Sequence, residues 1–137
     1  MNGVAVMVDP GANRHEASSI LVVEDNDQLR KSICEVLAEN FSGISIVEAA
    51  SCEEAVKNLV APAPDIVITD IRLPGDSGLV LTEKIKSRYP RLPVIIHTHY
   101  NMPEYRDAAS AIGADLFLVK GRIHLHQLCR LIGSFLD

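Results

Sequence analysis

Acidic, hydroxyl and ammonium side chains stand directly after four short apolar runs of the sequence. In chain order they are Glu24, Asp25, Asn26, Asp70, Thr98, His99 and Lys120. If the runs are parallel strands, these residues gather outside the carboxyl ends of one sheet, where such sheets bind ligands. Three carboxylates and one ammonium leave an excess of negative charge, which a divalent cation neutralises. Mg²⁺ takes carboxylates, waters and a substrate phosphate, so the set predicts a site for Mg²⁺ and a phosphoryl group.

Asp70 is the candidate nucleophile among the three acids, because it follows a middle run and has an ammonium and a hydroxyl after the neighbouring runs. The Lys120 ammonium and the Thr98 hydroxyl, with Mg²⁺, would hold the phosphoryl oxygens during transfer. Each residue alone has an ordinary structural explanation, since acids often cap helices and threonine often ends a strand. Their coincidence at one sheet edge favours the functional interpretation.

Five β-branched runs, beginning near residues 20, 44, 66, 94 and 116, must position this set. Three of them are almost continuously apolar, which is typical of parallel strands covered on both faces. Segments with helical period separate the runs, so we expect right-handed crossovers. The sequence therefore predicts an α/β fold, a doubly wound (βα)5 domain with a parallel five-stranded sheet.

Capping residues mark most of the expected helices. Asn26 or Asp27 can cap the first helix, and Ser51 with Glu54 forms a capping box for a second helix that carries Leu59 and Val60. A third helix is expected from about 77 to 88. Pro103 suits the start and Gly113 the end of a fourth helix. A fifth carries Ile123, Leu128, Leu131, Ile132 and Phe135 towards the C-terminus.

Composition limits the class of protein. The 137 residues have 47% hydrophobic content, which suits one globular domain. The formal net charge of −5 argues against direct nucleic-acid binding, which needs a basic face. No apolar run approaches the roughly 20 residues of a membrane span, and three widely spaced cysteines favour a cytoplasmic location. We expect a flexible N-terminal arm at 1–18, in which an extra edge strand is the alternative, and a domain at 19–137.

Three stretches carry a family resemblance: 20–26 (ILVVEDN), 65–79 (DIVITDIRLPGDSGL) and 113–120 (GADLFLVK). With them, the chain from residue 20 to about 135 resembles the receiver domain of bacterial two-component response regulators. Residues 99–105 look most like receivers of LuxR-type regulators. The resemblance implies a flavodoxin-like strand order of 2-1-3-4-5.

The resemblance also implies roles. Asp70 would accept a phosphoryl group from a sensor histidine kinase, which would make the chain a phosphoprotein. The chain would not be an enzyme, apart from phosphorylating itself from phosphodonors and slowly removing its own phosphoryl group. Glu24 and Asp25 would bind Mg²⁺ together with Asp70 and the backbone carbonyl of Arg72.

The implied response to phosphorylation involves residues of the fourth and fifth strands. Thr98 would sense the phosphoryl group, Lys120 would pair with it, and Phe117 would be the switch aromatic. A downstream output domain or protein, and a homodimer on phosphorylation, are the implied partners. Two departures from the family pattern, His99 and Gly121, affect the expected rate and lifetime of phosphorylation.

Other functions remain as alternatives. A phosphorelay shuttle uses the same residues, and a pseudo-receiver would have the fold without phosphorylation, although this chain retains the acids and the lysine. A haloacid-dehalogenase-type phosphatase needs a second acid two residues after the nucleophile, where this chain has Arg72. The pairs His97/His99 and His124/His126 suggest metal ligands. In a strand the first pair would share a face and in a helix the second pair would point apart, and we do not expect a histidine metal site.

Overall fold

The computed structural model describes residues 18–136, and most of the expected arm, at 1–17, lies outside the described residues. Five strands alternate with five helices along this part of the chain. The strands are β1 (Ser19–Val23), β2 (Ser45–Ala49), β3 (Ile66–Thr69), β4 (Val94–Thr98) and β5 (Leu116–Val119). The helices are α2 (Asp27–Asn40), α3 (Cys52–Lys57), α4 (Gly78–Arg88), α5 (Pro103–Ala111) and α6 (Leu125–Leu136).

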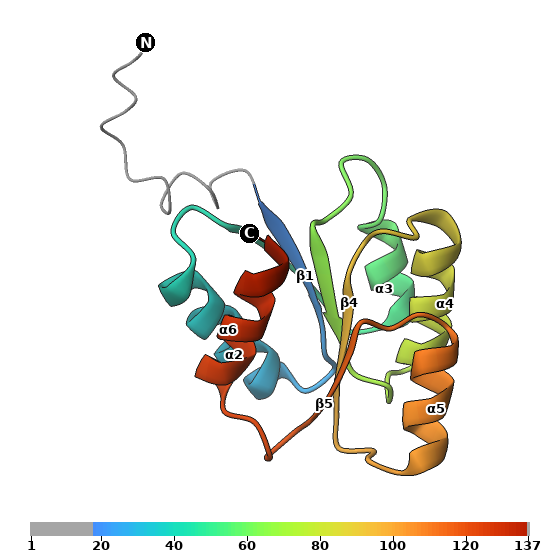
Figure 1. Ribbon diagram of the computed structural model, residues 1–137. Helices are drawn as coiled ribbons and strands as arrows, with labels where there is room; N and C mark the ends of the chain where they lie inside the picture. Colours follow the sequence, from blue (N-terminus) through green and yellow to red (C-terminus); the bar gives the residue numbers. More distant parts are fainter. Residues whose placement is uncertain (1–17, 137) are drawn as a thin grey trace.

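All strands are parallel and form one sheet in the order β2-β1-β3-β4-β5. Helices α2 and α6 cover one face, and α3, α4 and α5 cover the other (Figure 1). The predicted doubly wound α/β fold and its 2-1-3-4-5 strand order are therefore confirmed.

Each face of the sheet has its own apolar core. Leu21, Val67 and Ile96 face α3–α5, and the core on that side includes Cys52. Side chains at alternate positions, such as Ile68 and Ile95, face α2 and α6, where Cys129 is part of the core. Burial of β1, β3 and β4 from both sides explains their nearly continuous apolar sequences.

Two expected helix boundaries were wrong. Helix α3 ends at Lys57, so Leu59 and Val60 follow it, the first buried and the second 58% exposed. The prolines at 62 and 64 lack the amide that a continuing helix would need. Ile123 precedes α6 and forms an isolated bridge with Lys120 instead.

The strand register brings the polar residues to one edge. Val23 pairs with Thr69, and Thr69 pairs with Ile96. The ladder continues past the strands, because the Asp70 amide donates to the Val23 carbonyl at 3.2 Å and the Lys120 amide to the Thr98 carbonyl at 2.8 Å.

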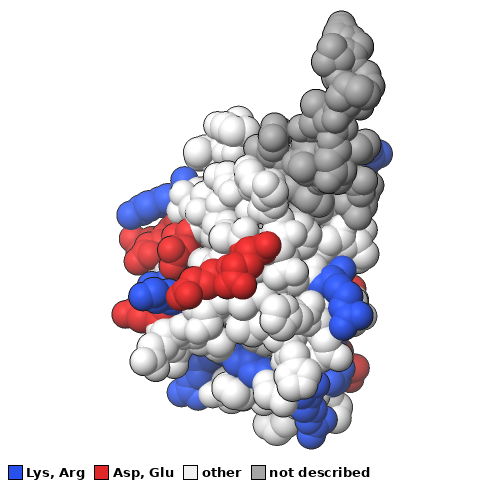
Figure 2. Space-filling model, turned by 90° about the vertical axis from the view of Figure 1, so that its left-hand side faces the viewer, with Lys and Arg blue, Asp and Glu red and all other residues white. Residues whose placement is uncertain are grey.

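On the part of the α2 and α6 face that the described residues form, acidic side chains gather on one side, and basic side chains lie on the other side and along the lower end, with uncharged surface between them (Figure 2). No helix among residues 18–136 is long and apolar enough to cross a membrane.

Candidate functional site

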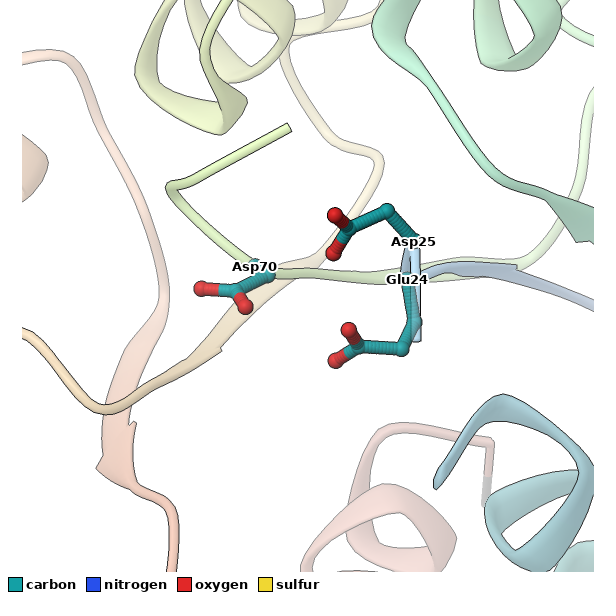
Figure 3. Close-up of side chains that lie close together, drawn as sticks. All are labelled: Glu24, Asp25 and Asp70. Atoms are coloured by element: carbon teal, nitrogen blue, oxygen red, sulfur yellow. The ribbon is translucent and has the colours of Figure 1, made fainter. Parts of the chain in front are cut away.

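Three carboxylates converge at the carboxyl edge of the sheet. Glu24 and Asp25 follow β1, Asp70 follows β3, and their carboxylates face a common space (Figure 3). A ligand oxygen from each lies within 4.8 Å of the others. Glu24 and Asp70 are 2% and 6% exposed, whereas Asp25 is exposed. The cluster offers buried anionic oxygens with one open side.

Lys120 joins two of these acids. Its Nζ lies 2.7 Å from Glu24 Oε1 and 2.5 Å from Asp70 Oδ2, and its side chain is only 7% exposed. Burial by itself would lower the pKa of Lys120, but the hydrogen bonds to Asp70 and Glu24 outweigh it and raise this pKa. The ammonium therefore stays charged in the site.

Glu24 is held by its own loop as well as by Lys120. Its Oε2 accepts the Asn26 amide at 3.1 Å, while the Asn26 side chain caps α2 by accepting the Leu29 amide at 2.9 Å. Burial raises the pKa of Glu24, and the hydrogen bond from Lys120 opposes that rise.

The Asp70 carboxylate is fixed at both oxygens. Oδ1 accepts the Ile71 amide at 2.6 Å and the Arg72 amide at 3.4 Å, while Oδ2 accepts from Lys120. The Arg72 backbone therefore lies beside Asp70. The Arg72 side chain instead donates to the Tyr100 hydroxyl and lies 5.7 Å from the Tyr100 ring centre.

Gly78 lies in close contact with the backbone of Asp70. A Cβ at this first residue of α4 would overlap the Asp70 carbonyl oxygen, so a glycine is needed where the helix starts against β3. The Ser77 hydroxyl caps the same helix by accepting the Val80 amide at 3.3 Å.

Thr98 ends β4, one strand away from Asp70. It is fully buried, and its Oγ1 accepts the Tyr100 amide at 3.3 Å. In this structure the hydroxyl is therefore hydrogen-bonded to the backbone of the loop that leads to α5. Of the predicted set, Glu24, Asp25, Asp70 and Lys120 are brought together, and Thr98 lies at the neighbouring strand end.

Phe117 lies on β5, opposite Ile96, and is half-buried against the core under α3–α5. The Arg106 guanidinium of α5 lies 4.7 Å from its ring centre. Phe117 and Thr98 project from the same face of the sheet, because Ile96 pairs with Phe117 and Thr98 with Val119.

Sequence reasoning missed three features of the site. They are the Arg72–Tyr100 contact, the Arg106–Phe117 contact and the burial of His97. The first two join residues that are 28 and 11 positions apart, and no local pattern marks such a pair. His97 was considered only as a metal ligand paired with His99, yet His97 is buried and His99 is exposed.

Comparison with known proteins agrees with this geometry. The model of the response regulator receiver domain family matches residues 20–132. The chain belongs to this family. The receiver is 37% identical over 102 residues to the transcriptional activator protein ExaE of Pseudomonas putida, covering 74% of this chain and 47% of that protein. It is 37% identical over 106 residues to the phosphate regulon transcriptional regulatory protein PhoB of Escherichia coli, covering 76% and 45%.

Solved structures give the same result. A CheY-like receiver domain protein from Methanospirillum hungatei superposes with a TM-score of 0.81 at 26% identity, covering 88% of this receiver and 94% of that chain. A LuxR-family DNA-binding response regulator from Staphylococcus aureus superposes with a TM-score of 0.80 at 24% identity, covering 88% and 99%, which shows the shared fold. The resemblance to response regulator receivers is confirmed, and this receiver spans about half the length of ExaE and PhoB.

Proposed function

We propose that this receiver accepts a phosphoryl group from a sensor histidine kinase on Asp70, in the cytoplasm, and passes the signal to an output domain or protein. One observation carries the proposal: the Asp70 carboxylate lies 2.5 Å from a buried ammonium and shares its space with two further carboxylates. A nucleophilic oxygen, a fixed cation and ligands for a divalent metal are the parts that phosphoryl transfer uses.

The donor set fits Mg²⁺, because three carboxylate oxygens at one partly open edge suit a hard cation that keeps waters and phosphate oxygens as further ligands. Glu24, Asp25 and Asp70 would hold it, with the Arg72 carbonyl as a proposed fourth ligand. When bound, Mg²⁺ would neutralise the acidic cluster and the phosphoryl oxygens.

The residues of the chain divide the remaining work. The Ile71 and Arg72 amides hold Asp70 Oδ1 and so fix the plane of the carboxylate. Lys120 offsets negative charge beside Oδ2. In the transfer, an Asp70 oxygen forms the new bond to phosphorus, the phosphorus–nitrogen bond of the kinase phosphohistidine breaks, and its electron pair leaves with the imidazole.

The structure also supports a proposal for the response. A phosphoryl group on Asp70 adds roughly −1.5 to −2 charges and strong acceptors, which attract the Thr98 hydroxyl. Thr98 would then give up the Tyr100 amide that it now accepts. The movement of Thr98 would open space on the face of the sheet that it shares with Phe117. Phe117 would then turn inward, away from Arg106. This would change the surface formed by α5, β5 and α6, which a partner or a second copy would recognise.

Intact-mass measurement tests the proposal. The protein is treated with a small phosphodonor and Mg²⁺, with Asp70→Asn as the test variant and Asp107→Asn, on the exposed side of α5, as the matched control. We expect one labile phosphoryl group on the wild type and on Asp107→Asn, and none on Asp70→Asn or without Mg²⁺. Equal labelling of wild type and Asp70→Asn would remove Asp70 as the acceptor.

A further inference from the structure

His97 is a buried histidine beside the site to which the proposed chemistry gives no role. It is the next-to-last residue of β4, is 3% exposed and pairs with Leu118 of β5. Strand alternation places its side chain on the face of Ile95, under the α2 and α6 layer. Lys120 follows Leu118 by two residues, so the imidazole and the lysine lie at the same end of neighbouring strands.

The Nδ1 atom of His97 lacks a hydrogen-bond partner. Among the buried side-chain nitrogen and oxygen atoms of residues 18–136, it alone has no hydrogen-bond partner. Other buried polar side chains are paired, such as Thr82, whose hydroxyl donates to the Gly78 carbonyl at 2.7 Å. Unpaired buried acceptors are unfavourable and rare, so this one calls for an explanation.

Lys120 has the complementary deficit. An ammonium carries three N–H donors, and the structure pairs Nζ with two acceptors, Glu24 and Asp70. At 7% exposure the side chain has little access to water. One buried group therefore has a spare donor and its neighbour has a spare acceptor.

His97 is suited to act as that acceptor because it is neutral. Burial, and next the positive charge of Lys120, lower the pKa of His97 to about 4. A neutral imidazole carries one proton, and with the proton on Nε2 the buried Nδ1 accepts.

The ammonium needs another acceptor once a metal binds. Glu24 Oε1 and Asp70 Oδ2, which now accept from Lys120, belong to the carboxylates that would bind Mg²⁺. A divalent cation therefore competes with the ammonium for these groups. Loss of the Glu24 oxygen would leave the buried ammonium with a further N–H donor to satisfy.

We propose that His97 is a positioning residue for Lys120, whose ammonium donates to His97 Nδ1 when it gives up Glu24. The inference rests on the proposed function, because it needs a cation at Glu24 and Asp70. The Lys120–His97 bond would keep the ammonium at the carboxyl edge of the sheet, within reach of a phosphoryl group on Asp70.

Nitrogen NMR of His97 tests the bond directly. Spectra of the wild type are recorded alone, with Mg²⁺, and with Mg²⁺ plus beryllium fluoride as a phosphoryl mimic. We expect a neutral imidazole with the proton on Nε2, and an Nδ1 resonance that moves on loading in the direction of an accepted hydrogen bond. Lys120→Met should abolish the movement. An unchanged Nδ1 resonance, or the same movement in Lys120→Met, would overturn the proposal.

Phosphorylation rates give a second readout. His97→Leu removes the acceptor with little change of volume and is expected to fold, whereas His97→Asn keeps an oxygen acceptor. Loss of an outer-shell partner at a metal site typically costs 10–100-fold in affinity or activity. We expect an effect at the lower end for His97→Leu, roughly a tenfold slower phosphorylation, and partial recovery in His97→Asn. Leu118→Met, at the paired position, is the packing control and should keep the wild-type rate.

The outcomes separate the two proposals. A wild-type rate in His97→Leu overturns the role of His97 and leaves Asp70 as the acceptor. If the wild type takes no phosphoryl group, the proposed function fails, and the Nδ1 resonance with Mg²⁺ alone decides whether His97 receives Lys120.

Discussion

Glu24 and Asp25 are adjacent in sequence but occupy different environments. Glu24 is buried and bound to Lys120 at 2.7 Å, whereas Asp25 is exposed at the open side of the cluster. A cation must compete with the ammonium at Glu24. Asp25 is therefore expected to contribute more of the binding energy for Mg²⁺.

Asp25→Ala should weaken Mg²⁺ binding more than Glu24→Ala. Calorimetric titration of both variants and the wild type measures the difference, with Asp27→Ala as a control on the exposed start of α2. A larger loss of affinity in Glu24→Ala would show that Glu24 is the stronger Mg²⁺ ligand. The Lys120 ammonium would then not compete effectively with Mg²⁺ for the Glu24 carboxylate.

At the scale of residues, the sequence was enough to predict that Asp70 and Lys120 meet. Both stand directly after apolar strands, and parallel strands end at the same edge. The state of His97 was beyond the sequence, because a histidine near a strand end can face solvent. It is buried here by neighbours from β5 and the α2 and α6 layer, which are distant along the chain.

Among the elements, α4 begins in direct contact with the backbone of Asp70. Gly78→Ala should push α4 away from the Asp70 backbone, because the new Cβ overlaps the Asp70 carbonyl oxygen. We expect a loss of about 1–3 kcal/mol in the free energy of unfolding, typical of overpacking, together with weaker Mg²⁺ binding.

Gly133→Ala is the matched control for Gly78→Ala. Gly133 also lies in a helix, but its added Cβ would only touch the Phe41 ring at 3.4 Å. Alanine is the better helix former by roughly 1 kcal/mol, so chemical denaturation should show unchanged or higher stability. Equal losses in both variants would refute the specific contact between α4 and Asp70.

The link from Thr98 to α5 and β5 predicts a second element-scale effect. Thr98→Ala removes the hydroxyl that accepts the Tyr100 amide and that we expect to follow the phosphoryl group. This variant should still be phosphorylated at Asp70, with much smaller changes in hydrogen exchange at 100–109 and at Phe117. Thr82→Ala, a buried threonine in α4, is the control. If Thr98→Ala showed the full change in hydrogen exchange, the coupling from Asp70 to α5 and β5 would run through the loop of Lys120 and Gly121 instead.

Helix boundaries that a local capping residue sets were easier to predict than those that tertiary contacts set. Ser51 and Ser77 both cap their helices through the side-chain oxygen, as their sequence context indicates. The end of α3 depends on Asn58, whose side chain donates to the Glu54 carbonyl, and on the prolines that follow. The start of α6 depends on the Lys120–Ile123 bridge, a tertiary feature that helical periodicity cannot reveal.

For the whole molecule, His97 makes stability depend on pH. Its pKa is lowered from the ordinary value of 6.5 to about 4 in the fold, first by burial and then by Lys120, with Asp70 opposing and His99 adding to the effect. Between these values the unfolded chain binds more protons than the folded one, so stability falls as pH falls. Glu24, whose pKa is raised, acts in the opposite direction.

Comparison with His97→Leu isolates this contribution. From pH 7 to pH 4 the wild type should lose up to about 3 kcal/mol of unfolding free energy relative to His97→Leu. Urea denaturation at a series of pH values measures it, and His126→Gln on the exposed side of α6 is the control. A constant difference between wild type and His97→Leu across this range would contradict a neutral, buried His97.

The two cores of the molecule each contain a thiol. Cys52, the first residue of α3, is buried in the core on the α3–α5 side, and Cys129 of α6 is buried in the core on the opposite face of the sheet. Burial raises the pKa of both, that of Cys129 to about 11, so neither reacts as a thiolate while its layer is closed. Alkylation of each cysteine then requires local opening of its own layer. Cys34 of α2 also packs against the α2 and α6 core, so it must be replaced before the two sides are compared. In a Cys34→Ser background, the alkylation rates of Cys52 and Cys129 would measure the opening of each side of the sheet separately, before and after treatment with a phosphodonor.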